Sequence, residues 1–106
     1  MIVQTQTTSF KAEVYQAVHN LLTDTIKIAL YTADANLNED TTVYSTLNEV
    51  GASGYAAGGE IMTGVTLNSS GYTVYVNFAN VSWSTSVTAR CALIYNYSKS
   101  NKSIAV

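Results

Sequence analysis

Charge, proline and cysteine are all scarce in this 106-residue chain, and each shortage excludes something. Only 11% of the residues are charged, against roughly 25% in an ordinary soluble domain, and there is no proline. The five basic residues are too few and too scattered to follow a phosphate backbone, so we expect no nucleic-acid partner. The single cysteine, Cys91, allows neither an internal disulfide nor a CxxC metal knuckle.

Long apolar runs are missing as well. No stretch approaches the roughly 20 apolar residues that a membrane span needs, so we expect no membrane association. Residues 1–8 lack the basic and apolar regions of a signal peptide, which predicts synthesis in a reducing cytoplasm. At this length we expect one domain over residues 1–106, with a single hydrophobic core.

Residues that favour β structure dominate what is present. The chain holds fourteen threonines and eight tyrosines beside many valines and isoleucines, all of which suit a pleated, half-buried surface. A β-rich domain with so few surface charges is prone to association. The composition therefore favours a subunit that packs against neighbours in an assembly.

Residues 9–22 show the one convincing helical period. Ser9 is a suitable N-cap, and six apolar residues follow at the spacing of a 3.6-residue repeat. These six residues are Phe10, Val14, Ala17, Val18, Leu21 and Leu22. We expect the stripe to lie on a β core.

From Ile26 onward the period changes to two, which indicates strands separated by polar loops. Loops are predicted at 33–42 and 51–59, and Asn68-Ser69-Ser70-Gly71 is a hairpin signal. Short strands in quick succession are typical of a sandwich or barrel. The expected strands cover residues 26–31, 43–47, 61–67, 72–78, 81–83, 88–95 and 103–106.

One loop has a partial resemblance to a calcium site. Asp34, Asn36 and Asn38 stand at alternate positions, as the first oxygen ligands of such a loop do. The turn glycine and the final bidentate glutamate of that motif are both absent. We therefore expect a solvated acidic loop here and predict no metal and no cofactor.

Catalytic chemistry has no recognisable set of residues. His19 has no partner at helical spacing, so neither a nucleophile nor an orienting group can be named for it. Cys91 lies in an apolar strand, where a buried structural thiol is the common case. The glycine-rich loop 51–59 has no phosphate-binding motif, and we expect a flexible loop or a subunit contact there.

The tyrosines suggest contact surfaces. Tyrosine and tryptophan are enriched at protein interfaces because they combine a large area with a polar tip. We expect Tyr72 and Tyr95 in the core and Tyr55 and Tyr97 on the surface. An alternative use of Tyr55, Tyr97 or Trp83 is stacking on sugars.

The last residues, Ile104-Ala105-Val106, are apolar and look like the opening of a strand. Two interpretations are open. The strand pairs with the sheet edge of a neighbouring subunit, or further chain follows it.

Several blocks of sequence form one familiar pattern over most of the chain. They are Phe10-Lys11, Asp24-Thr25-Ile26-Lys27-Ile28-Ala29-Leu30-Tyr31-Thr32, Asn48-Glu49-Val50, Gly54-Tyr55-Ala56-Ala57-Gly58-Gly59, Trp83 and Thr88-Ala89-Arg90-Cys91-Ala92-Leu93-Ile94-Tyr95-Asn96. Together they resemble a family of small virion proteins of tailed bacteriophages. The resemblance implies a non-enzymatic structural protein of the particle, made in the host bacterial cytoplasm. Cys91 departs from it, since a glycine is expected there, and similar proteins continue past residue 106.

We therefore predict a mainly β fold, a β-sandwich of jelly-roll or immunoglobulin-like character with one N-terminal helix. The predicted function is that of a capsid decoration (cement) protein. The alternatives are a tail, neck or fibre component and a carbohydrate-binding module. Expected partners are the major capsid protein or tail components, and further copies of this chain. The candidate contact residues are Asp34, Asn36, Asn38, Tyr55, Gly58, Gly59, Tyr97, Ile104 and Val106.

Overall fold

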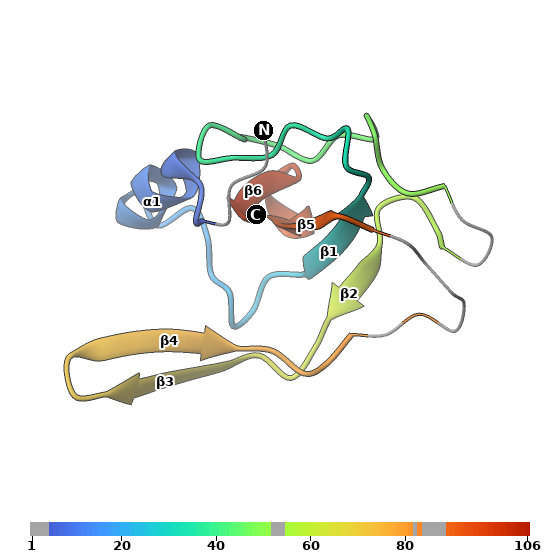
Figure 1. The fold of residues 1–106 in the computed structure, drawn as a ribbon. Helices are drawn as coiled ribbons and strands as arrows, with labels where there is room; N and C mark the ends of the chain where they lie inside the picture. The colour runs from blue at the N-terminus through green and yellow to red at the C-terminus, as the bar shows by residue number, and fades with distance from the viewer. Residues whose placement is uncertain (1–4, 52–54, 82, 84–88) are drawn as a thin grey trace.

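The fold consists of one short helix and two antiparallel sheets (Figure 1). A computed structural model describes residues 5–51, 55–81, 83 and 89–106. Strands β2, β1, β5 and β6 form a four-stranded sheet in that order, whereas β3 and β4 form a separate hairpin. A mainly β fold with one N-terminal helix is thereby confirmed. In chain order the elements are α1 (Thr8–Tyr15), β1 (Ile26–Tyr31), β2 (Glu60–Met62), β3 (Thr66–Ser70), β4 (Thr73–Asn77), β5 (Cys91–Asn96), η1 (Tyr97–Lys99) and β6 (Lys102–Ala105).

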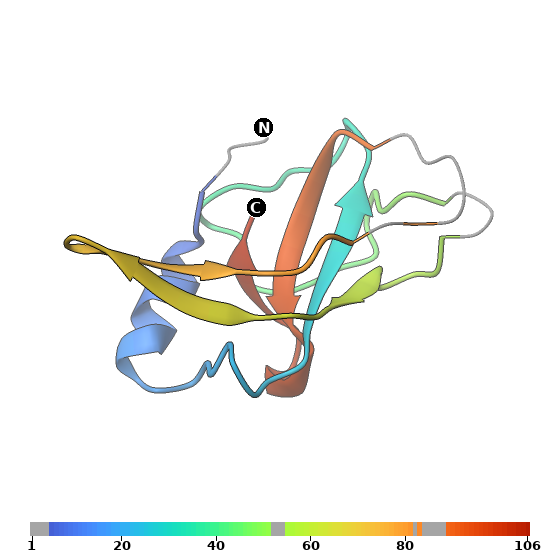
Figure 2. The ribbon, with the colours of Figure 1, turned by 90° about the horizontal axis from the view of Figure 1, so that it is seen from below.

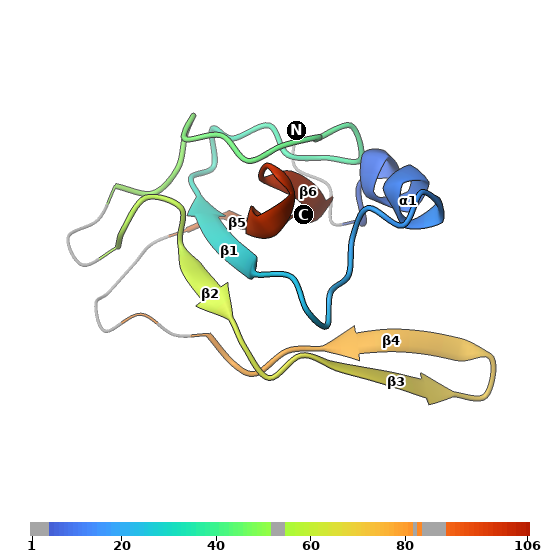
Figure 3. The same cartoon turned by 180° about the vertical axis from the view of Figure 1, so that it is seen from behind.

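The centre of the molecule is the antiparallel pair of β1 and β5. Ala29 stands opposite Leu93, and the pairing continues along both strands. One face of this pair is covered by the segment 32–50, which runs along the top of Figures 1 and 3. The buried cluster on that face consists of Ala29, Tyr31, Ala35, Leu37, Leu93 and Tyr95.

The opposite face of the sheet has a thinner cover. A second buried cluster of Phe10, Ile26 and Ile104 fills one end of it, where α1 packs on β6. The hairpin β3–β4 lies below this face in Figure 1 and crosses in front of it in the view from below (Figure 2). Four apolar side chains of β1 and β5 on this face are only half-buried, namely Ile28, Leu30, Ala92 and Ile94.

The outer edge of β6 is occupied by other parts of the same chain. Thr5 exchanges two backbone hydrogen bonds with Val106, at 3.1 and 2.9 Å. The Thr7 N–H donates to the Ile104 carbonyl at 3.0 Å, and the Ser103 N–H donates to the Thr42 carbonyl at 2.8 Å. The C-terminal strand therefore finds partners on both sides within one chain.

The helix is shorter than the sequence predicts. It ends at Tyr15, because Gln16 closes it and Ala17 adopts a left-handed conformation with φ of 58°. Thr7, not Ser9, is the N-cap, and its hydroxyl accepts a hydrogen bond from the Phe10 N–H. The predicted helix over residues 9–22 is therefore wrong beyond Tyr15. After that point the chain leaves the helical conformation and makes tertiary contacts, such as that of His19 with Asn96.

The strands differ from their predicted bounds in the middle of the chain. The predicted strand 61–67 is two strands, and between them Gly64 has a positive φ of 62°. The predicted strand 72–78 is β4, and the hairpin turn lies at Gly71 and Tyr72 rather than at 68–71. Val43 forms only an isolated bridge, and Val81 and Trp83 lie outside any strand. Ser82 and residues 84–88 fall outside the described residues.

Candidate interaction surface

The β3–β4 hairpin has one polar and one apolar face. Its register pairs Leu67 with Val76 and Ser69 with Val74, so these four side chains share a face. Leu67 is 57% exposed and Val74 is 68% exposed. The opposite face carries the pairs Thr66–Asn77, Asn68–Tyr75 and Ser70–Thr73. The hairpin thus shows apolar side chains to solvent on the side where a strand usually buries them.

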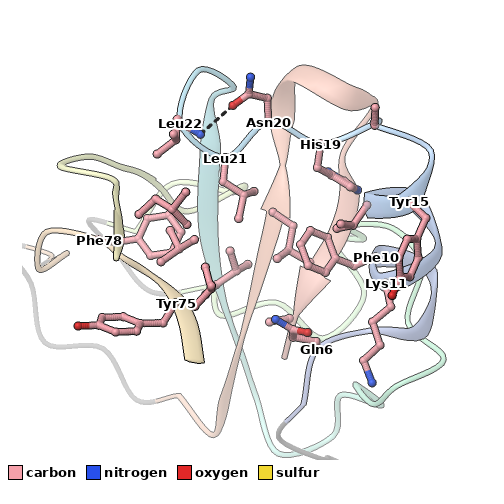
Figure 4. Close-up of a pocket in the computed structure, with 18 residues that line it drawn as sticks. Gln6, Phe10, Lys11, Tyr15, His19, Asn20, Leu21, Leu22, Tyr75 and Phe78 are labelled. Carbon is pink, nitrogen blue, oxygen red and sulfur yellow. Dashed lines mark hydrogen bonds between the residues drawn. The ribbon is translucent and has the colours of Figure 1, made fainter. Parts of the chain in front are cut away.

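An open apolar groove of about 970 Å³ lies between the hairpin and the body of the molecule. Leu67, Val74 and Val76 line it on the hairpin side, and Phe10 and Ile104 line it on the side of α1 and β6. Figure 4 shows Phe78 and Leu21 on one side of the groove and Phe10 and His19 on the other. An open groove lined mainly by apolar side chains is a candidate contact surface.

The hairpin belongs to a long uncharged stretch. Residues 61–89, 29 in all, contain no Asp, Glu, Lys, Arg or His. Exposed strand edges are normally protected from pairing by charged residues or proline, and this hairpin has neither. A two-stranded hairpin alone is at best marginally stable in water, so it gains stability from any surface that covers it.

Three of the sequence-predicted contact residues, Tyr55, Gly58 and Gly59, lie in or beside a hydrogen-bonded tyrosine cluster next to the segment 32–50. Glu49 is its centre: one carboxylate oxygen accepts from the Tyr44 hydroxyl at 2.6 Å. The other accepts from the Tyr55 hydroxyl at 2.6 Å and from the Gly58 N–H at 2.9 Å. The Tyr95 hydroxyl donates to the Gly58 carbonyl at 2.6 Å. Glu49 therefore fixes the glycine loop against the core.

Burial of this cluster changes the acidity of its hydroxyl groups. Burial, together with the nearby Glu49 and Tyr97, raises the pKa of Tyr95 to about 12. Burial, together with the hydrogen bond to Glu49 and its negative charge, raises the pKa of Tyr44 and of Tyr55 well above the usual range. These hydroxyls stay protonated at neutral pH and act as hydrogen-bond donors.

The structure separates the candidate contact residues of this region. Tyr55 is buried, and its ring lies 5.8 Å from the Trp83 ring. Gly58 is buried and Gly59 is half-buried, with positive φ values of 96° and 77°. Tyr97, by contrast, is 57% exposed, and the Lys27 ammonium lies 4.8 Å from its ring centre. Tyr72, expected in the core, is fully exposed at the hairpin turn, whereas Tyr95 is buried as predicted.

The acidic loop is held by hydrogen bonds of its own. Asn38 Oδ1 accepts a hydrogen bond from the Asp40 N–H at 2.8 Å, and Asn38 Nδ2 donates to Asn36 Oδ1 at 3.3 Å. The Asp34 backbone carbonyl accepts from the Asn48 amide at 3.0 Å. Asp34 and Asn36 are exposed. Among the described residues, no three His, Cys, Asp or Glu side chains come together in a way that could hold a metal ion.

His19 joins the end of the helix to the end of β5. Its Nδ1 accepts from the Asn96 amide at 3.0 Å, so its Nε2 carries the proton and donates to Glu13 at 2.8 Å. The same Asn96 amide donates to Asp24 at 2.8 Å. This chain of contacts connects the helix, the segment after it and β5.

The remaining candidates lie in or near the core. Ile104 is buried in the cluster with Phe10, and Val106 packs on the cluster around Tyr95. Cys91 is half-buried at the start of β5, and burial raises the pKa of its thiol, against the opposing effect of Arg90. A thiol of raised pKa is a poor nucleophile at neutral pH.

The apolar hairpin face was not singled out by sequence patterns. The sequence pattern places Leu67 at the end of one strand and Val74 in the next, and alternation alone leaves open whether an apolar strand face is covered. The signal present in the sequence is the uncharged stretch 61–89 around a hairpin turn. In the described part of the chain, no helix is long and apolar enough to cross a membrane.

Comparison with family models, with curated proteins and with solved structures found no match for this chain. The bacteriophage resemblance therefore rests on the sequence blocks themselves.

Proposed function

We propose that this protein is a non-enzymatic structural subunit that works by assembly with other protein subunits. The observation that supports this most is the apolar groove bordered by an uncharged, exposed hairpin. Covering such a surface removes apolar area from water, at about 25 cal/mol for each Å².

We further propose that the assembly is the virion of a tailed bacteriophage and that the subunit decorates the capsid. The sequence blocks that resemble small virion proteins support the assignment to a virion. The exposed loop at Asp34 and Asn36 offers polar contacts to a shell. A decoration protein that binds only the assembled shell stabilises it by mass action. The partners are then the major capsid protein and further copies of this chain.

The finer fold assignment belongs to the same proposal. The four-stranded sheet and the hairpin below it form two β layers, as in Figure 2, and a β-sandwich of jelly-roll or immunoglobulin-like character is the completed form we propose. The half-buried face of β1 and β5 supports this, because it is the face that a second sheet covers in a sandwich.

A tail, neck or fibre position remains the alternative within the particle. It would use the same apolar surface. A carbohydrate-binding module is less well supported, because Tyr55 is buried and donates to Glu49 while Tyr97 holds a lysine over its ring. Sugar stacking needs an aromatic face open to the ligand.

Immunogold electron microscopy of purified virions, with an antibody against this chain, tests the proposal. Gold over the whole head supports decoration, and gold confined to the tail or neck supports the alternative position. Particles without gold contradict both. Preimmune serum on the same particles is the control.

A further inference from the structure

We propose that His19 is a pH-sensitive latch, which holds the segment 16–25 on the end of β5 while its imidazole is neutral and releases it when the imidazole is protonated. The latch consists of Glu13, His19, Asp24 and Asn96, which come from α1, the segment after it and β5. It concerns contacts within one chain and is independent of the proposed function.

The centre of the latch is closed to solvent. The His19 side chain is 1% exposed, and Asn96 is fully buried. Asn96 Nδ2 lies between two acceptors, at 3.0 Å from His19 Nδ1 and at 2.8 Å from Asp24 Oδ2. A buried amide that loses one of these partners cannot turn to bulk water instead, so each contact contributes to holding the segments together.

The neighbours of Asn96 determine which way its amide faces. The reverse orientation would put Oδ1 in the place of Nδ2, 2.8 Å from the Asp24 carboxylate oxygen, with one acceptor against another. In the observed orientation, Oδ1 is buried and has no hydrogen-bond partner among the described residues. The amide is therefore held through its donor side, and both donor contacts need an acceptor opposite them.

Protonation removes the acceptor that His19 offers to Asn96. A neutral imidazole has one N–H and one acceptor nitrogen, whereas an imidazolium has two N–H groups. Glu13 Oε1 already accepts from Nε2 at 2.8 Å, so the added proton goes to Nδ1 and faces the NH2 group of Asn96. If the Asn96 amide turns to offer Oδ1, it gives up its bond to Asp24. In either case one contact of the latch is lost.

In the described part of the chain, the charged groups at the latch form two pairs. Lys102 Nζ of β6 lies 3.7 Å from Glu13 Oε2, and Lys99 Nζ of η1 lies 4.0 Å from Asp24 Oδ1. Each carboxylate that faces the imidazole thus has an ammonium group beside it. The imidazolium keeps its contact with Glu13 on the helix, so the contact that opens is the one with β5.

The segment that the latch holds forms part of the apolar groove. His19, Leu21 and Leu22 line the groove, and Figure 4 shows the His19 ring beside that of Phe10, with ring centres 5.0 Å apart. Histidine is the side chain whose charge ordinarily changes between about pH 5 and about pH 8. Acidification over this range is therefore expected to loosen one wall of the groove without any ligand.

Nuclear magnetic resonance of the isotope-labelled full chain tests the latch. At about pH 8 the His19 ring should carry a proton on Nε2 only. As the second proton binds toward about pH 5, the Asn96 side-chain amide resonances should shift in step with those of the ring. The backbone amides of Asn20 and Asp24, which bond to each other's oxygens, should then lose at least about fivefold in hydrogen-exchange protection, measured against intrinsic exchange at the same pH.

His19→Asn is the variant, because its amide oxygen stands in for Nδ1 as an acceptor and does not titrate. It should remove the pH response of Asn96, Asn20 and Asp24. Asp40→Asn, at an exposed position, is the control and should keep the wild-type response.

Several results would overturn the latch. They are a proton on Nδ1 at about pH 8, a ring that stays neutral down to about pH 5, and protonation of His19 without a change at Asn96 and Asp24. An undiminished response in His19→Asn would assign the effect to another group. If His19→Asn does not fold, the titration of the wild-type chain decides alone.

Discussion

Glu49 is a side chain on which three hydrogen-bond donors depend. Its carboxylate accepts from Tyr44, Tyr55 and the Gly58 N–H. Glu49→Gln replaces one acceptor oxygen by a donor, so at least one of these groups loses its partner. We expect the free energy of unfolding to fall by about 1 to 3 kcal/mol in urea denaturation. Glu39→Gln, at an exposed position, is the control and should change it by less than about 0.5 kcal/mol.

The buried tyrosines predict loss of stability at alkaline pH. Burial raises the pKa of Tyr95 to about 12 and raises the pKa of Tyr31 above the usual range. A pKa that is higher in the folded state stabilises the fold below the unfolded value of about 10, and this contribution is lost as pH rises through the folded value. The urea midpoint of unfolding should therefore stay constant between about pH 7 and about pH 9 and fall above about pH 10. Ultraviolet absorbance follows the ionisation of the tyrosines in the folded protein. A single step near pH 10 for all eight tyrosines would contradict this prediction.

Asp24 predicts the opposite dependence at acid pH. Burial opposes its ionisation, but hydrogen bonds from the Asn20 N–H and the Asn96 amide, with the charge of Lys99, hold its pKa below the usual value of 3.8. A lowered pKa stabilises the fold above 3.8, and this contribution is lost as pH falls through the folded value. Asp24→Asn should therefore be less stable than wild type at neutral pH, by about 1 to 2 kcal/mol, with the difference shrinking in acid. Asp40→Asn, in the exposed loop, is the control, and an equal pH dependence of both differences would refute the assignment.

At the scale of elements, the glycine loop and β1 touch at a point that excludes a side chain. A Cβ on Gly59 would lie 1.8 Å from the Ile28 carbonyl oxygen, and the φ of Gly59 is +77°. Gly59→Ala should therefore destabilise the fold by more than about 3 kcal/mol in thermal or urea unfolding. Gly51→Ala is the matched control, because nothing lies within 4 Å of its added Cβ. Equal stability of the two variants would show that the loop does not contact β1.

The elements were predicted well where local pattern and tertiary environment agree. β1 occupies the predicted residues Ile26–Tyr31, because a strand at the centre of a sheet buries one face along its whole length. The helix failed after Tyr15: Val14 is 49% exposed and Leu22 is 54% exposed, so half of the apolar stripe never reaches the core. There His19 turns toward Asn96, a contact between residues 77 apart that no local repeat encodes.

At the scale of the whole molecule, stability is distributed unevenly. β1 and β5 contain buried side chains along their length, whereas β3 and β4 pack mainly on each other. Backbone amides of the hairpin should therefore exchange with deuterium faster than those of β1 and β5. Hydrogen exchange followed by mass spectrometry measures this. Hairpin protection equal to that of β1 would contradict it.

The candidate surface shows the limit of sequence patterns in the same way. The scarcity of charge predicted association, and the structure adds where the apolar area gathers. Tyr55 illustrates the converse: its type suggested an exposed contact, yet Glu49 and the Leu30 N–H place its hydroxyl inside the chain. Residue type sets what a side chain can bond to, and only its neighbours in space decide which bond is made.

The sequence by itself determined the β class, the central strand and the uncharged character of residues 61–89, because these follow from composition and a local period of two. The tertiary structure decided where the helix ends, which tyrosines are buried around Glu49, and that the apolar hairpin face borders an open groove. Those features depend on contacts between distant segments, whose free energies outweigh the small differences in local propensity.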